Sequence, residues 1–185
     1  MSGHLKQGRM IAVVGPSGVG KDSLMTAIAA QRPDLTVVRR VITRDPERGG
    51  EDFEPVSEQT FQSLAKAGGF CLQWQAHGLF YGIPEAARLS VRSGRDGLVN
   101  LSRGVLQEAE AIFGALTVLN VTASPEVLAQ RLAGRGRETA AEIAARLKQA
   151  DKPLDQGVPS YDIHNDGTLE EAVAQALRVL YPVSA

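Results

Sequence analysis

The chain has 185 residues, enough for one domain with a substantial hydrophobic core. Its formal net charge of −1 at pH 7 gives no overall attraction to nucleic acid or to a membrane surface, so we expect neither as a partner. The single cysteine, Cys71, excludes an internal disulfide, and no apolar run reaches the roughly 18 residues that span a bilayer. We therefore expect a cytoplasmic protein, and the sequence leaves its oligomeric state open.

Apolar runs alternate with helix signals along the chain. The first apolar run, 9–14, predicts a buried strand, and a glycine-rich loop and a helix over 23–31 follow it. A β-branched run predicts the next strand over 35–43. Two further apolar strands are expected over 97–101 and 115–122, with a helix between them.

The middle of the chain is less regular. Residues 43–55 carry many charges, two prolines and a Gly-Gly pair, which indicates a loop. Ser57 can cap a helix that runs to about residue 67. The aromatic segment 70–83 predicts a hairpin that turns at His77-Gly78.

Helix-start signals fill the last third of the chain. Ser124 precedes a proline at the first helical position, and Thr139 and Thr168 each stand three residues before a glutamate, the spacing of a capping box. The second box begins a terminal helix that ends near Tyr181. Strands alternating with helices imply an α/β three-layer sandwich with a mainly parallel central sheet covered on both faces.

The most specific motif is Gly-x-x-x-x-Gly-Lys, which is filled by Gly15, Gly20 and Lys21 between the first strand and the first helix. Glycines let backbone N–H groups turn inward around phosphate oxygens, and the helix N-terminus adds partial positive charge. We therefore predict a P-loop NTPase fold in which Lys21 reaches the β- and γ-phosphates of ATP. The expected nucleotide contacts are Gly15, Pro16, Ser17, Gly18, Val19, Gly20, Lys21, Asp22 and Ser23.

The position after the lysine is Asp22, where a P-loop usually has Ser or Thr. Two interpretations of Mg²⁺ binding follow from this departure. Either the Asp22 carboxylate holds the metal directly or through water, or Ser23 takes over the hydroxyl role. The alternative is that Asp22 only favours the helix N-terminus.

Residues 128–147 carry four arginines in two predicted helices that a glycine-containing turn separates. Positioned guanidinium groups stabilise the charge that builds on a transferred phosphoryl group, and a closing lid excludes water. We predict that this segment is a lid whose arginines act with Lys21 in catalysis. These arginines are Arg131, Arg135, Arg137 and Arg146. A solvated charged hairpin is the alternative.

The segment over about 44–95 is predicted to be an acceptor-binding insertion into a core over about 9–43 and 96–185. Within it, Arg44 and Arg48 are candidates to bind an acceptor phosphate, and the Tyr81 hydroxyl can donate a hydrogen bond to one. The alternatives are surface salt bridges and a core tyrosine. Farther along the chain, Asn165 lies in a loop that either packs against an adenine base or is a simple turn.

From about Met10 to Tyr181, the chain resembles the guanylate kinase branch of the nucleoside monophosphate kinases. Asn100 and Ser102 stand where guanylate kinases have carboxylates, and reading the guanine edge needs a buried acceptor such as a carboxylate. GMP is therefore the less expected acceptor. The motifs that carry the resemblance are GPSGVGK at 15–21, TRDP at 43–46, YG at 81–82, RLAGRGRE at 131–138 and HNDG at 164–167.

A closer resemblance is to the ribose 1,5-bisphosphate phosphokinase family, a relative of guanylate kinase associated with phosphonate breakdown. It rests on GKDSL at 20–24, VITRD at 41–45, WQAHGLFYG at 74–82, LVNLSRG at 98–104 and SPEVLAQRLAGRGRE at 124–138. The resemblance implies Mg²⁺-assisted transfer of the ATP γ-phosphate to the C1 phosphate of ribose 1,5-bisphosphate, giving 5-phosphoribosyl 1-diphosphate (PRPP).

With a phosphorylated sugar as the acceptor, Arg103 becomes a candidate phosphate clamp, and Asn100 and Ser102 become candidate partners of the ribose hydroxyls. The rival activity is that of a guanylate kinase, converting GMP to GDP. A rival of another class is a non-catalytic binding module of the guanylate kinase type. Such a module needs neither Lys21 nor the lid arginines.

Overall fold

The computed structural model describes residues 7–48, 51–136, 139–150, 154 and 157–182. In these ranges, five strands form a central sheet in the order β2-β7-β1-β8-β9, and every neighbouring pair is parallel, which confirms the predicted sheet. Because parallel strands end at the same edge, the loops after β1, β7, β8 and β9 meet there. The strands are β1 (Met10–Val14), β2 (Thr36–Val37), β7 (Gly97–Asn100), β8 (Leu116–Thr122) and β9 (Ser160–His164).

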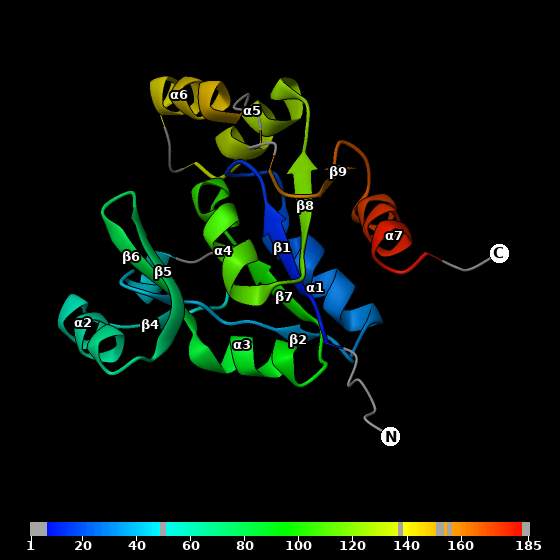
Figure 1. The fold of residues 1–185 in the computed structure, drawn as a ribbon. Helices are drawn as coiled ribbons and strands as arrows, with labels where there is room; N and C mark the ends of the chain where they lie inside the picture. Colours follow the sequence, from blue (N-terminus) through cyan, green and yellow to red (C-terminus); the bar gives the residue numbers. More distant parts are fainter. Residues whose placement is uncertain (1–6, 49–50, 137–138, 151–153, 155–156, 183–185) are drawn as a thin grey trace.

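The central strand β1 shows why helices cover both faces of the sheet. Its five residues are fully buried, and successive side chains point to opposite faces. Met10, Ala12 and Val14 pack into one hydrophobic cluster, whereas Ile11 and Val13 pack into another. The first cluster includes side chains of α3 (Glu85–Arg92) and α4 (Leu106–Phe113), and the second includes those of α1 (Lys21–Gln31) and α7 (Leu169–Leu180) (Figure 1).

Four further strands of the described chain form a second sheet in the order β4-β3-β6-β5. The predicted hairpin is confirmed: β5 and β6 pair antiparallel, and the turn residues His77 and Gly78 have φ values of 52° and 74°. Helix α2 (Glu58–Lys66) begins as predicted, because the Ser57 hydroxyl accepts a hydrogen bond from the Thr60 N–H at 3.1 Å. The strands are β3 (Val41–Ile42), β4 (Glu54–Pro55), β5 (Phe70–Ala76) and β6 (Leu79–Pro84).

The single strand predicted over 35–43 is wrong. The chain divides there into β2 and β3, which belong to different sheets. Between them lie Arg39, which is exposed, and Arg40, which is buried. A β-branched run predicts extended backbone, but it carries no information about the point at which the chain passes from one sheet to the next.

Two helices stand over the edge of the sheet where the strands end (Figure 1). They are α5 (Pro125–Gly134) and α6 (Ala140–Ala150), and short 3₁₀ turns, η1 (Pro46–Arg48) and η2 (Arg103–Val105), lie elsewhere along the chain. The predicted caps are confirmed. The Ser124 hydroxyl accepts from the Val127 N–H, and Thr139 and Thr168 each form the reciprocal contacts of a capping box with the glutamate three residues later.

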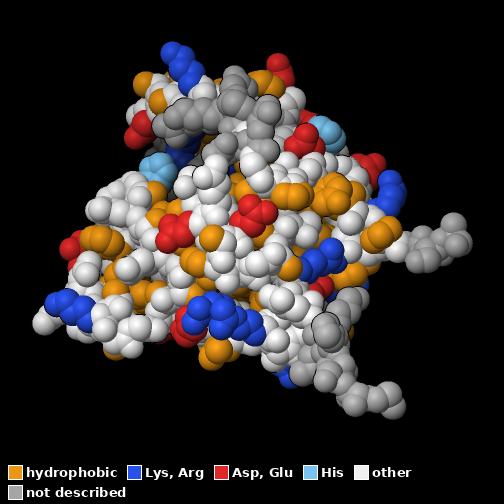
Figure 2. Space-filling model, in the orientation of Figure 1, with side chains coloured by type: hydrophobic (Ala, Val, Ile, Leu, Met, Phe, Trp, Pro, Cys, Tyr) orange, Lys and Arg blue, Asp and Glu red, His pale blue; other side chains and the backbone are white. Residues whose placement is uncertain are grey.

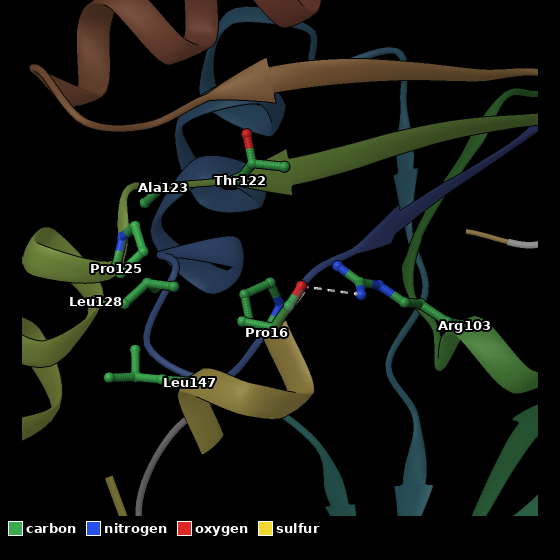
Figure 3. Close-up of a pocket in the computed structure, with 8 residues that line it drawn as sticks. Pro16, Arg103, Thr122, Ala123, Pro125, Leu128 and Leu147 are labelled. Carbon is green, nitrogen blue, oxygen red and sulfur yellow. Dashed lines mark hydrogen bonds between the residues drawn. The ribbon is translucent and has the colours of Figure 1, made fainter. Parts of the chain in front are cut away.

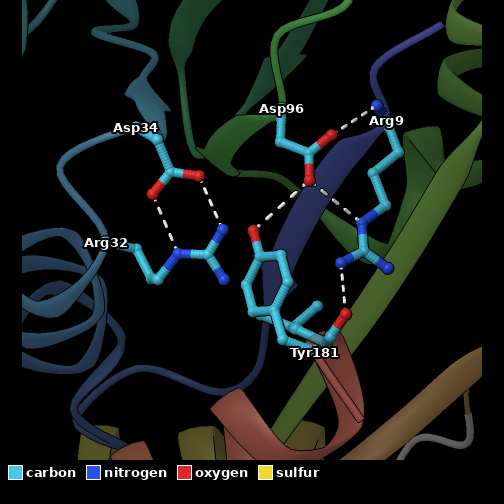
Figure 4. Close-up of polar contacts among 6 residues, drawn as sticks. Arg9, Arg32, Asp34, Asp96 and Tyr181 are labelled. Carbon is cyan, nitrogen blue, oxygen red and sulfur yellow. Dashed lines mark hydrogen bonds and ion pairs between the residues drawn. The ribbon is translucent and has the colours of Figure 1, made fainter. Parts of the chain in front are cut away.

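At the other end of the sheet, where the strands begin, polar contacts join segments that are distant in sequence (Figure 4). The Asp96 carboxylate accepts from the Arg9 N–H at 3.0 Å and from the Tyr181 hydroxyl at 3.3 Å. The Arg32 guanidinium lies 3.4 Å from the centre of the Tyr181 ring and pairs with Asp34. This network holds the start of β1, the loop before β7 and the end of α7 together, away from the loops that follow the strands.

On the face shown in Figure 2, acidic and basic side chains are interspersed with apolar ones. None of the helices in the described ranges combines the length and the apolar character needed to cross a membrane.

Candidate active site

The loop between β1 and α1 takes the conformation that its glycines allow. Gly18 and Gly20 have φ values of 84° and 94°, in the left-handed region that favours glycine. A side chain at Gly15 would lie 2.5 Å from the carbonyl oxygen of Val121, and one at Gly20 would lie 2.7 Å from the amide nitrogen of Asn165. The loop is therefore packed closely against the ends of β8 and β9.

Lys21 begins helix α1 and folds back over this loop. Its Nζ donates hydrogen bonds to the carbonyl oxygens of Gly15 at 2.9 Å and Pro16 at 3.1 Å. Burial lowers the pKa of Lys21 to about 8, while the neighbouring Asp22 carboxylate opposes the shift. An anion bound in the loop would raise this pKa again, because opposite charge at short range favours the ammonium ion.

A cavity of about 390 Å³ opens on one side of the loop, between helix α5 and the segment after β9. Its volume is typical of a site for a small-molecule ligand. The side chains and backbone that line it are those of Gly18, Gly20, Ser23, Arg131, Arg135, Asn165, Gly167 and Leu169.

Arg131 and Asn165 hold the loop through its backbone. The Arg131 guanidinium donates to the carbonyl oxygens of Val19 at 3.3 Å and Asn165 at 2.8 Å. The Asn165 side chain is 5% exposed, and its amide donates to the same Val19 oxygen at 2.7 Å. Asn165 therefore holds the loop through the Val19 carbonyl oxygen, a contact that the sequence did not predict.

The other predicted lid arginines fall in three different places. Arg135 caps the C-terminus of α5 and lines the same cavity as Arg131. Arg146 is exposed on α6, one turn after Glu142, whose pKa is lowered by hydrogen bonds from Thr139 and, to a smaller extent, by the Arg146 charge. Arg137 lies outside the residues that the structure describes.

Arg103 reaches the loop from η2, just after strand β7, and points towards Pro16 (Figure 3). Its guanidinium donates to the Ala150 carbonyl oxygen and to the Asn120 side-chain oxygen, both at 3.4 Å, and burial lowers its pKa. A smaller cavity, of about 150 Å³, lies between this side chain, the end of β8 and the two helices above. Arg103 thus connects the loop region to the C-terminal end of α6.

Asp22 and Ser23 lie on different sides of the loop. Ser23 lines the large cavity, whereas the Asp22 carboxylate accepts a hydrogen bond of 3.5 Å from the Asn100 amide. The same amide nitrogen donates to Glu51, also at 3.5 Å. Asn100 is the last residue of β7 and is 8% exposed, and Ser102, which is half-buried, precedes η2.

Sequence reasoning missed a buried ion pair between Arg40 and Glu51. The Arg40 Nε donates to Glu51 at 3.1 Å, a second guanidinium nitrogen contacts the other carboxylate oxygen, and the side chains are only 8% and 12% exposed. The sequence carried one signal of it, the adjacent arginines Arg39 and Arg40 inside the strand predicted over 35–43. Adjacent residues of an extended chain face opposite sides, so one of the two had to point inward.

Asn100 and Ser102 stand where guanylate kinases have carboxylates, but Glu51 supplies a largely buried carboxylate to the acceptor region. The Arg40 guanidinium lies 5.1 Å from the centre of the Tyr81 ring and 5.9 Å from that of Trp74, and the two rings stack at 5.2 Å. Tyr81 is 6% exposed on β6. In the structure, therefore, the ring of Tyr81 lies beside the Arg40 guanidinium.

The two other predicted acceptor residues follow strand β3. Arg44 is half-buried, and its guanidinium carbon lies 5.2 Å from the centre of the Phe53 ring. Arg48 ends the 3₁₀ turn η1, and its side chain lies outside the described part of the structure.

Comparison with known proteins identifies the family. The family model named guanylate kinase matches residues 7–181. A ribose 1,5-bisphosphate phosphokinase of Ruegeria sp. (strain TM1040) is 53% identical over 176 residues, which cover 94% of this chain and 92% of that protein. The chain belongs to the ribose 1,5-bisphosphate phosphokinase family. A phosphokinase of the same name from Rhizobium etli is 43% identical, over 95% of this chain and 90% of its own length.

Solved structures show the same fold. The crystal structure of guanylate kinase from Anaplasma phagocytophilum superposes with a TM-score of 0.63 at 22% identity, covering 95% of this chain and 85% of the other. The predicted P-loop α/β fold is thus confirmed. As a member of the ribose 1,5-bisphosphate phosphokinase family, this chain is a nucleotide-binding kinase.

Proposed function

We propose that the protein transfers the γ-phosphate of ATP to the C1 phosphate of ribose 1,5-bisphosphate, giving PRPP and ADP. An oxygen of the C1 phosphate attacks the γ-phosphorus, and the bond to the oxygen that bridges the β- and γ-phosphates breaks. The observation that carries the proposal is the 53% identity to the Ruegeria phosphokinase over nearly the whole of both chains. Because ATP is the phosphate donor, we place the reaction in the cytoplasm.

On the nucleotide side, the loop from Gly15 to Ser23 holds the ATP phosphates, and the large cavity beside Asn165 receives the rest of the nucleotide. Lys21 lies over the loop, where it can reach the β- and γ-phosphates. The segment over about 128–147 acts as the lid. Its arginines supply positive charge to the transferred group, and these are Arg131, Arg135, Arg137 and Arg146.

The residues at the start of α1 fit a magnesium ion. Asp22 and Ser23 offer hard oxygen donors, and the described residues contain no group of three or more His, Cys, Asp or Glu side chains able to hold a metal on their own. This suits an ion that takes most of its ligands from ATP and water. We assign Asp22 as its protein ligand, because the Asp22 carboxylate faces Asn100 and the acceptor side, with Ser23 as the alternative. Bound Mg²⁺ would neutralise charge on the phosphates.

On the acceptor side, the insertion over about 44–95 and the end of β7 surround the sugar. Arg44, Arg48, Tyr81 and Arg103 bind its phosphates, and Asn100 and Ser102 bind its hydroxyl groups. The attacking phosphate is already an anion, so no strong general base is needed. Catalysis then consists of alignment and charge stabilisation.

The same geometry disfavours GMP. Glu51, a largely buried carboxylate in this region, has both oxygens engaged by Arg40. A carboxylate occupied in this way is a poor reader of the N–H groups on a guanine edge, because the neutral base would leave the Arg40 guanidinium without an anionic partner.

An acceptor screen tests the proposal. Purified protein is supplied with ATP and Mg²⁺, and ADP release is measured with ribose 1,5-bisphosphate or with GMP as the acceptor. We expect turnover of the bisphosphate and little of GMP. Robust turnover of GMP alone would identify a guanylate kinase, and ATP binding without turnover of any acceptor would indicate a non-catalytic module.

A further inference from the structure

In the function proposed above, the Arg40–Glu51 pair only disfavours GMP and has no role toward the sugar, yet it lies on the acceptor side and Asn100 contacts it. Removing two opposite charges from water costs more free energy than a surface pair does, so an arginine is seldom buried without a specific use. The planar fork of an arginine that grips a carboxylate with two nitrogens fits a phosphate equally well. Glu51 therefore occupies a position that a phosphate group could take.

We propose that Arg40 binds the phosphate of the acceptor that is not phosphorylated, the one on C5, and that Glu51 holds this position until the acceptor arrives. The inference rests on the proposed function, since it takes ribose 1,5-bisphosphate as the acceptor. It assigns Arg40 as the residue by which the protein distinguishes a sugar bisphosphate from a sugar with one phosphate.

The position of Arg40 relative to the P-loop supports this assignment. Asp22 follows Lys21, the Asn100 amide lies 3.5 Å from the carboxylates of both Asp22 and Glu51, and Arg40 in turn holds Glu51. The accepting C1 phosphate must lie next to the γ-phosphate at the loop. The furanose ring separates C1 from C5, so the second phosphate must lie farther from the loop. Among the described residues, Arg40 is the buried cation that this series of side-chain contacts reaches on the acceptor side.

The surroundings of Arg40 fix the plane of its guanidinium group. Trp74 and Tyr81, stacked on each other, present their rings to it, and β3, which begins at the next residue, pairs with β6. A guanidinium held against aromatic rings loses little further freedom when it binds an anion. The charges of Arg40 and Glu51 also act on Lys21, one lowering and the other raising its pKa, so the pair shares the electrostatic field of the loop.

The neighbouring residue provides a matched control. Arg39 also forms ion pairs, with Asp52 at 2.9 Å and Glu54 at 2.5 Å, but its side chain is 49% exposed. Its pairs are of the kind that contribute little to stability. Replacing Arg39 thus removes the same charge from the same segment without opening the buried position.

The test compares two acceptors in three proteins. The double variant Arg40→Met, Glu51→Gln removes both buried charges together, so neither is left unpaired, and Arg39→Met is the control. The kcat/KM is measured for ribose 1,5-bisphosphate and for ribose 1-phosphate, which lacks the C5 phosphate. The wild-type protein and the control should have the higher kcat/KM with the bisphosphate. In the double variant, the ratio of the two kcat/KM values should fall by at least about 30-fold, with the KM for ATP unchanged.

A second measurement uses ribose 5-phosphate, which carries only the C5 phosphate, as a competitive inhibitor. It should inhibit the wild-type protein and bind several-fold more tightly to Glu51→Gln, because the carboxylate no longer competes for Arg40. A double variant that folds, retains turnover and keeps the full preference for the bisphosphate would overturn the role of Arg40. A wild-type protein that does not use ribose 1,5-bisphosphate would instead refute the proposed function itself.

Discussion

The nucleotide side and the acceptor side of the P-loop are held by different kinds of contact. On the nucleotide side, Arg131 and Asn165 donate to main-chain oxygens, including that of Val19. On the acceptor side, the contacts run between side chains, from Asp22 through Asn100 and Glu51 to Arg40. Main-chain partners are present whatever the side chains are, whereas side-chain partners must be matched to one another. The acceptor side is therefore the part of this fold in which substrate choice can change while ATP binding is kept.

The largest effect is expected at the junction of the two sides. Lys21→Ala should lower kcat by about 1,000-fold or more, because a charge poised at the transferred group in a water-poor site is lost. The fold should survive, since within the described residues the amine bonds to carbonyl oxygens of its own loop. Lys66→Ala, an exposed lysine at the end of α2, is the control. Steady-state kinetics and thermal melting check both points, and near-normal kinase activity would refute the assigned site.

The next effect should fall on ATP binding and on the transfer step, and should leave acceptor binding unchanged. Arg131→Ala removes the hydrogen bonds to Val19 and Asn165 and should raise the KM for ATP by about 10- to 100-fold, in line with the loss of charge-assisted bonds of about 1.5–3 kcal/mol. The KM for the acceptor should change little. Arg178→Ala, on the exposed part of α7, serves as the control. If the KM for the acceptor rose instead, the proposed division of labour between the two sides would be wrong.

The pH dependence of ATP affinity should also follow the nucleotide side. The pKa of Lys21 is about 8 in the free protein, and bound phosphates must raise it, so the charged amine binds ATP better. Affinity should therefore be constant below pH 8 and fall above it, towards tenfold per pH unit until the pKa of the complex is reached. Calorimetric titration from pH 7 to 10 would measure this. Lys21→Arg keeps its charge across that range, and an equally steep fall in that variant would exclude Lys21 as the cause.

The smallest effect is expected from replacing Asp22, the proposed Mg²⁺ ligand between the nucleotide side and the acceptor side. Asp22→Ser restores the usual residue and removes a carboxylate that contacts Asn100. If Asp22 helps to hold Mg²⁺, the concentration of Mg²⁺ needed for half-maximal rate should rise by several-fold, while the rate at saturating Mg²⁺ changes less. Ser23→Ala tests the alternative ligand in the same assay. An unchanged Mg²⁺ dependence in Asp22→Ser would rule out the assignment of Asp22.

What the sequence predicted correctly depends on local signals. The glycines of the P-loop, the caps at Ser57 and Ser124 and the hairpin turn at His77 each act through residues a few positions apart. The contacts that it did not predict join distant segments: Asn165 with Val19, and Arg40 with Glu51 across a change of sheet. Such pairs depend on how whole elements pack. The adjacent arginines indicated that one of them points inward, but nothing along the chain identified its partner.

The most direct test of the central claim is the structure of the product. The protein is incubated with ATP, Mg²⁺ and ribose 1,5-bisphosphate, and the reaction is followed by ³¹P NMR. The account predicts two coupled phosphorus signals from a new diphosphate on C1, a C5 phosphate signal that remains uncoupled to phosphorus, and ADP in equal amount. Release of inorganic phosphate from ATP with no new diphosphate on the sugar would contradict it.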